Sequence, residues 1–193
     1  MKSGTRTLGV AASDGDTRST LCGALVRADR VVDGCVFGEC TVGGTDSTET
    51  VSRLFSTLGR DDVQYLLLSG VAPAWFNLYD LHAIHEATGT PVLSVSFEAS
   101  EGLASTLREQ FEGEDLAKRL AVYESLPPRQ RVTVNDQPVF VRAVGVDDEE
   151  ARDVVRTFTP EGGRPEPLRV ARLVARAGRE FGESIRGDRS PAN

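Results

Sequence analysis

Cysteine, histidine and lysine are scarce in this sequence of 193 residues. The three cysteines (Cys22, Cys35 and Cys40) are odd in number and lack CxxC spacing, which argues against a disulfide framework or a zinc site and favours small buried side chains. No apolar run approaches the ~20 residues that span a bilayer, and the starting segment MKSGTRT has no hydrophobic signal region. We therefore predict a cytoplasmic protein without a membrane partner.

Basic residues are fewer than acidic residues, and almost all of the basic residues are arginines. The formal net charge is −7, which argues against a general binder of duplex DNA. Among the 22 basic residues only Lys2 and Lys118 are lysines, and residues 164–189 hold seven arginines against four acids. Because a guanidinium forms bidentate bonds to phosphate, this region is where the sequence would contact an anionic partner.

The first half of the chain predicts a mixed sheet. Apolar segments at residues 5–13, 21–28 and 30–42 are joined by short links and predict an antiparallel meander of three strands. A capping box that opens at Asp46 predicts a helix, and residues 63–97 then show the strand, helix and strand of a βαβ crossover between parallel neighbours. The order βββαβαβα is that of the ribonuclease H-like fold, an α/β fold with helices flanking the sheet, although several α/β topologies share the pattern.

The second half completes one predicted domain over residues 1–183. The expected elements are helices at 102–111 and 114–126, a hairpin at 132–144 with Pro138 at a sheet edge, a helix opened by the capping box of Asp147 and Glu150, and a last helix at 167–181. We predict that residues 184–193 form a disordered tail.

Four sequence blocks resemble a known family. The resemblance to the archaeal "domain of unknown function 99" family is carried by VVDGCVFGECTVGGTDST, LLLSGVAPAWFNLYDLHAI, SFEASEGL and FTPEGGRPEPLRVARLVARA, and it extends from about Leu8 to about Ala177. That family resembles endonuclease V, a ribonuclease H-like enzyme that cuts nucleic acid beside deaminated bases. The segments TGTPVLSV and PEPLRVA also resemble endonuclease V directly.

The resemblance implies a metal site, but the residues expected to build it are replaced. Such nucleases use carboxylates to hold Mg²⁺. Where the endonuclease V pattern has its metal-associated residues, this sequence has Ala11 in the first strand, Ser69 after the central strand and Arg172 in the last helix. Phe97 stands in place of a lysine, and Val71–Phe76 replaces a loop that bears histidine. We therefore predict no endonuclease V reaction and no cofactor.

An active enzyme with relocated ligands is the alternative, and it alone would require Mg²⁺ or Mn²⁺. The candidate ligands are the acids Asp14, Asp16, Asp46, Glu49 and Asp80. Ordinary structural roles compete with this interpretation, because acids stabilise turns and cap helices. His82 and His85 have a spacing that can chelate a metal, but a partly buried structural His85 is the favoured interpretation.

The last helix is the most suggestive binding element. An apolar stripe is predicted from Val170, Leu173, Val174, Ala177 and Phe181, with Arg169, Arg172, Arg176 and Arg179 on a nearly opposite face. That face is either solvated and paired with acids, or it binds phosphate or RNA with an extension at Arg142. Trp75 and Phe76 either plug the core or staple the next helix, or they stack on a base.

The leading hypothesis is a non-catalytic protein that binds single-stranded or structured nucleic acid. Arg142, Arg169, Arg172 and Arg176 would contact the nucleic acid, and the pocket around Ala11, Ser69 and Asp14 would hold a nucleotide without cutting it. A third hypothesis is a protein-interaction module that docks a protein partner on Gly113–Val144.

Overall fold

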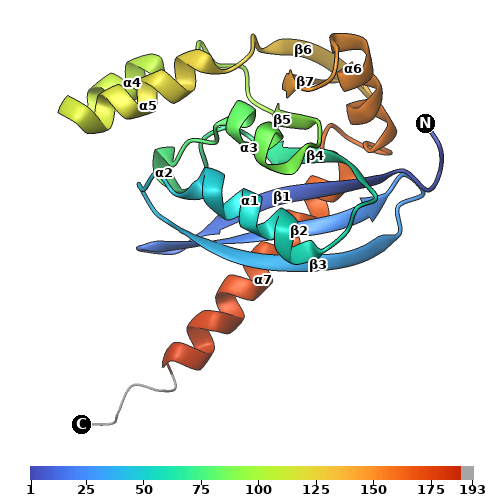
Figure 1. Ribbon diagram of the computed structural model, residues 1–193, viewed down its shortest axis with the longest axis horizontal. Coiled ribbons are helices and arrows are strands. Elements are labelled where there is room, and N and C mark those ends of the chain that lie inside the picture. The colour runs from blue at the N-terminus through green and yellow to red at the C-terminus, as the bar shows by residue number, and fades with distance from the viewer. Residues whose placement is uncertain (188–193) are drawn as a thin grey trace.

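A mixed sheet of seven strands forms the centre of the molecule in the computed structural model, which describes residues 1–187 (Figure 1). The strand order is β3-β2-β1-β4-β5-β7-β6. β1 pairs with β4 and β4 with β5 in parallel, whereas the other neighbours are antiparallel. This confirms the predicted meander and βαβ crossover. The strands are β1 (Arg6–Asp14), β2 (Arg18–Arg27), β3 (Val32–Thr41), β4 (Val63–Ser69), β5 (Val92–Ser96), β6 (Gln130–Val134) and β7 (Gln137–Val144).

Helices cover both faces of this sheet. They are α1 (Ser47–Leu58), α2 (Pro73–Phe76), α3 (Leu81–Thr88), α4 (Ala104–Gln110), α5 (Gly113–Ser125), α6 (Asp148–Thr157) and α7 (Glu166–Gly187). Because α7 continues to Gly187, the predicted disordered tail is wrong for residues 184–187, and its remainder lies outside the described residues. Within residues 1–187, no helix combines the length and apolar character that crossing a bilayer requires.

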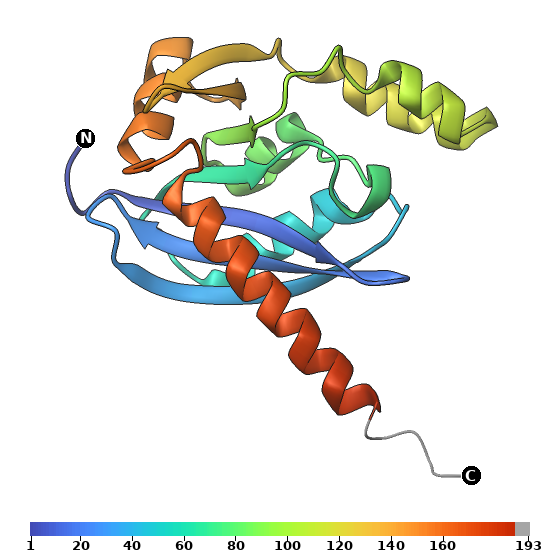
Figure 2. The ribbon, with the colours of Figure 1, turned by 180° about the vertical axis from the view of Figure 1, so that it is seen from behind.

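Alternation along β1 separates the two faces. Leu8 and Val10 point into a core that includes residues of α1 and α3, while Ala11 points to the opposite face and packs with Ala171 of α7. Figure 2 shows α7 crossing that second face diagonally, with its final turns beyond the strands.

The buried face of α7 differs from the predicted apolar stripe. Leu168, Ala171 and Ala175 are buried, whereas Leu173 and Phe181 are 62% and 68% exposed. The reason is close contact with the sheet, since a Cβ placed on Gly9 would lie 2.4 Å from the backbone carbon of Pro167. Next to this close contact the small side chains of Ala171 and Ala175 face the sheet, whereas Leu173 and Phe181 remain in solvent.

The predicted capping box at α1 is wrong. Asp46 precedes the helix without a capping hydrogen bond, and its carboxylate instead accepts from Thr41 N and Asn77 Nδ2 at 2.7–3.1 Å. Asn77 Oδ1 in turn accepts from the Ser47 N–H of the helix at 3.0 Å. A residue distant in sequence thus supplies the cap that the local pattern assigned to Asp46.

At α6, the Asp147 carboxylate accepts from the N–H groups of Glu149 and Glu150, as the predicted cap requires. The side chain of Glu150 does not complete the box, because it accepts from the Tyr65 hydroxyl at 2.6 Å. The predicted hairpin is also present, with β6 as the edge strand. Pro138 lies in the neighbouring β7, at a position that pairs only with β6.

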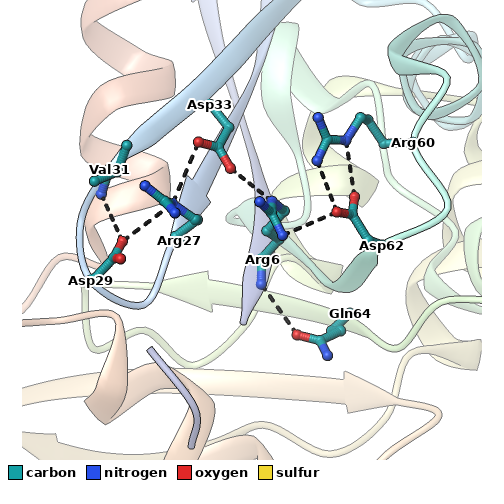
Figure 3. A network of polar contacts seen from close by, with 8 residues as sticks. All are labelled: Arg6, Arg27, Asp29, Val31, Asp33, Arg60, Asp62 and Gln64. Carbon is teal, nitrogen blue, oxygen red and sulfur yellow. Dashed lines mark hydrogen bonds and ion pairs between the residues drawn. The ribbon is translucent and has the colours of Figure 1, made fainter. Parts of the chain in front are cut away.

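Ion pairs join the strands at the amino ends of β1 and β4 (Figure 3). Arg6 bridges Asp33 at 2.7 Å and Asp62 at 3.0 Å, and Arg60 also bonds Asp62. Arg27 lies 3.4 Å from both Asp29 and Asp33. At this end of the sheet the drawn arginines are therefore balanced by acids, which distinguishes it from the opposite end.

Candidate nucleic-acid interface

The carboxyl ends of β1, β4 and β5 meet at one end of the sheet. Parallel pairing places Val10 opposite Leu68 and Ser69 opposite Val95, so Ala11, three residues before the end of β1, lies on the strand beside Ser69, the last residue of β4. Figure 2 shows β4 and β5 pointing toward the end at which α2 and the α4–α5 pair lie. Carboxyl ends of parallel strands are where open α/β sheets form ligand crevices.

Three of the four positions implied by the resemblance line one hollow of about 220 Å³, which we call the arginine hollow. Its lining consists of Ser69, Gly70, Val95, Ser96, Phe97, Glu98, Arg164 and Arg172. Ala11 lies beneath α7, buried with Ala24, Val26 and Ala171. The structure thus brings Ser69, Phe97 and Arg172 together in one hollow.

Arg164 is the residue that sequence reasoning missed. It lies in the connection to α7, which looks like an ordinary Gly/Pro linker, and its guanidinium stacks 3.9 Å from the centroid of the Phe97 ring. Its Nη1 atom is buried without a hydrogen-bond partner in the described part of the chain. Burial lowers the pKa of Arg164, and the charge of Arg172 lowers it further. An anion between the two guanidinium groups would relieve both effects.

Arg172 differs from the other arginines of its helix. Arg169 forms two bonds to Glu166 at 2.6–2.7 Å, and Arg176 bonds Glu180 at 2.8 Å. Arg172 is exposed and forms no hydrogen bond or ion pair with residues 1–187. The predicted arginine strip is therefore uneven, with Arg172 best prepared to contact a ligand.

The arginine hollow does not fit a divalent cation. Mg²⁺ prefers carboxylate oxygens, and the only carboxylate lining the hollow is that of the exposed Glu98. The guanidinium groups of Arg164 and Arg172 would repel a cation in the hollow. Ala11 offers only a methyl group, which cannot coordinate a metal ion. Within residues 1–187, no three histidine, cysteine or acidic side chains form a group that could hold a metal ion.

The alternative acidic ligands are dispersed. Asp14 accepts from Ser19 Oγ at 2.6 Å and lines a separate hollow of about 330 Å³ with Arg172 and Arg176. Asp16 is exposed on the turn after β1.

Asp46 has a structural role instead. Partial burial raises its pKa, but the hydrogen bonds from Thr41 and Asn77 lower it more, so the pKa lies below its ordinary value. Elsewhere, Glu49 pairs with Arg53 and Asp80 caps α3.

A second hollow of about 210 Å³ adjoins the first and shares Gly70, Ser96 and Glu98 with it. Arg142 lines this second hollow, but its guanidinium is committed to the backbone carbonyl of Pro127. Burial lowers the pKa of Arg142. Its predicted contact with nucleic acid would therefore compete with a structural bond.

The histidine pair does not act as a unit. His85 is half-buried and its Nδ1 lies 2.8 Å from the carbonyl oxygen of Thr90, in line with the structural role expected. His82 is exposed, and its Nε2 lies 3.2 Å from the carbonyl oxygen of Ser125.

The mixed sheet and its strand order give an endonuclease V-like domain with a ribonuclease H-like fold. Human endonuclease V superposes with a TM-score of 0.64 at 14% identity, covering 93% of this chain and 86% of that one. Endonuclease V from Ciona intestinalis, in complex with DNA containing an inosine, gives 0.60 at 13% identity, covering 92% and 86%. A protein of unknown function from Archaeoglobus fulgidus gives 0.81 at 24% identity, covering 90% and 97%.

Comparison of sequences points to one particular family. The family described as endonuclease dU matches residues 3–178. A UPF0215 protein of Pyrobaculum aerophilum is 33% identical over 168 residues, which cover 86% of this chain and 89% of that protein. The chain therefore belongs to the endonuclease dU family, and the predicted resemblance to an archaeal family allied to endonuclease V is confirmed.

Proposed function

We propose that this protein binds the backbone of nucleic acid in the arginine hollow without cutting it by a metal-dependent reaction. The observation that carries the proposal is the pair Arg164 and Arg172, placed where the endonuclease V pattern implies a metal site. One guanidinium has a buried, unpartnered Nη1 and the other has no ion pair within residues 1–187. Arg172 is therefore open to an anion that enters the hollow, and the half-buried Arg164 lines the same hollow beside it.

Phosphate suits this lining. Two guanidinium groups can form charge-assisted and bidentate bonds to phosphate oxygens. The hydroxyl groups of Ser69 and Ser96 add further potential donors at the same rim. The family description, endonuclease dU, and the DNA bound by the Ciona relative both support a nucleic acid as the source of that phosphate.

We expect binding without cutting because the side chains that line the hollow are poor ligands for a metal ion. The chemistry that the family description names, if metal-dependent, needs carboxylates to hold the ion and activate water. The hollow provides a single exposed carboxylate, Glu98, beside two cations.

The test compares Arg172→Ala with Arg53→Ala by fluorescence anisotropy on labelled single-stranded DNA and RNA. Both variants remove one charge from an exposed helical position, but Arg53 lies on α1, against the other face of the sheet. We expect Arg172→Ala to weaken binding about tenfold, as one lost charge-assisted contact predicts, and to flatten the salt dependence by roughly one phosphate contact. Equal effects of the two substitutions would refute the hollow as the binding site.

A further inference from the structure

The short segment α2, which follows β4, presents a half-exposed tryptophan on a strained backbone that departs from right-handed helix. Ala74, Trp75 and Phe76 have φ values of 47°, 52° and 60°, so three successive residues with side chains occupy the left-handed region. Such conformations are costly and persist only where surrounding contacts impose them. Trp75 nevertheless remains 50% exposed, which argues against the predicted role as a core plug.

The surrounding contacts hold the indole in place. The ring of Trp75 lies 5.2 Å from Phe111 and 5.8 Å from Phe76, measured between centroids. Gly43 approaches so closely that a Cβ there would lie 2.7 Å from the indole, and its N–H donates to the carbonyl of Ala74 at 2.7 Å.

A buried arginine completes this support. Arg119, only 4% exposed, donates to the carbonyl oxygens of Gly43, Gly44 and Phe76 and lies 3.9 Å from the centroid of the Phe111 ring. The arginine joins α5 to both loops that flank the tryptophan. The cluster therefore fixes the indole before any ligand arrives, which lowers the entropy cost of binding.

The position of Trp75 connects it to the arginine hollow. The second hollow shares Gly70 with the arginine hollow and continues to Ala72, and Trp75 follows Ala72 by three residues, a reach of at most ~11 Å. The two hollows thus give a strand bound at Arg172 a continuous path past Gly70 to Ala72. Trp75 lies within this chain reach of the end of that path, where a base further along the strand can meet the indole.

We infer that Trp75 is a stacking platform for an unpaired base, so that the preferred ligand is single-stranded nucleic acid. This inference rests on the proposed function. Stacking on an aromatic face needs no base-specific hydrogen bonds and requires a base that is free of its duplex partner. The net charge of −7 is compatible with this ligand, because stacking supplies affinity that charge does not.

Trp75 is the single tryptophan of the chain, so its fluorescence reports directly on the platform. The experiment titrates the full chain with labelled oligodeoxythymidylate and with a duplex of equal length, recording label anisotropy and tryptophan emission together. Trp75→Ala, Trp75→Phe and Phe181→Ala are measured in parallel by anisotropy. Phe181 is the matched control because it is an exposed aromatic residue near the far end of α7. Melting curves verify that each variant is folded.

We expect the single strand to quench the emission and to bind more tightly than the duplex. Trp75→Ala should weaken single-strand binding roughly 5- to 100-fold and abolish the preference over duplex, while Trp75→Phe retains most of the affinity and Phe181→Ala retains all of it. Salt-sensitive binding without quenching, unchanged by Trp75→Ala, would overturn the platform and leave the proposed function standing. Absence of binding to every oligonucleotide would overturn both.

Discussion

Replacing Arg119 by methionine should detach α5 from the loops around Trp75. Methionine fills much of the same volume but donates no hydrogen bonds, so the carbonyl oxygens of Gly43, Gly44 and Phe76 lose a donor at 2.5–3.3 Å. Those three residues are half-buried, and water can satisfy part of the loss. At about 1 kcal/mol for each lost bond, the free energy of unfolding should fall by about 3 kcal/mol.

For a chain of this size, that loss corresponds to a decrease of roughly 6–12 °C in Tm. Differential scanning calorimetry measures the decrease, and the emission of Trp75 shows whether its surroundings loosen first. Lys118→Met is the matched control on the same helix. Its ammonium is exposed and pairs with Glu114 at 2.8 Å, so a loss below about 1 kcal/mol is expected. If Arg119→Met melted within 2 °C of the parent chain, the buried guanidinium would not hold the platform.

Three further predictions concern the framework. Against the opposing effect of burial, hydrogen bonds from Asn77 and a neighbouring threonine hold the pKa of the Asp46 carboxyl below its ordinary value. Their contribution is present above about pH 4 and lost as pH falls through the folded pKa, so Asp46→Asn should cost about 2 kcal/mol in urea unfolding at pH 7 and progressively less as pH is lowered below 4; a cost that does not fall over this range would refute the role of these bonds. Gly9→Ala should destabilise the fold by about 1–3 kcal/mol in the same assay, because the new Cβ would meet Pro167, and an unchanged midpoint would refute this close packing. Iodoacetamide should alkylate Cys35 alone, because it is exposed and burial raises the pKa of both other thiols to about 12; modification of all three in the folded chain would contradict the packing around them.

The strand order could be predicted because each step left a local signal. The run from Val63 to Ser69 is continuous and apolar, as a strand covered on both faces must be, and Gly59 and Gly89 end their helices in the left-handed conformation. Such signals depend on neighbouring residues only.

Errors arose where the structure depends on contacts between distant segments. The buried face of α7 is decided by the absence of a side chain at Gly9, so the exposed Leu173 could not be anticipated from helical periodicity. The cap of α1 comes from Asn77, 30 residues after Ser47.

The candidate site likewise combines residues that could be predicted from the sequence with one that could not. Ser69, Phe97 and Arg172 were found through the resemblance, and the structure gathers them in one hollow. Arg164 gave no signal in sequence because its role depends on stacking against Phe97 and on proximity to Arg172. Its importance emerges only when the connection to α7 folds over the end of β5.

The most direct test of the central claim is a cleavage assay at saturating protein. Labelled oligonucleotides containing deoxyuridine or inosine are incubated with Mg²⁺ or Mn²⁺, and binding is read on a native gel while strand integrity is read on a denaturing gel. An active endonuclease V serves as the positive control on the same substrates. We expect a salt-sensitive mobility shift with intact strands. Metal-dependent cutting that is lost in Asp14→Asn would contradict this expectation and would transfer the reaction to acids outside the arginine hollow.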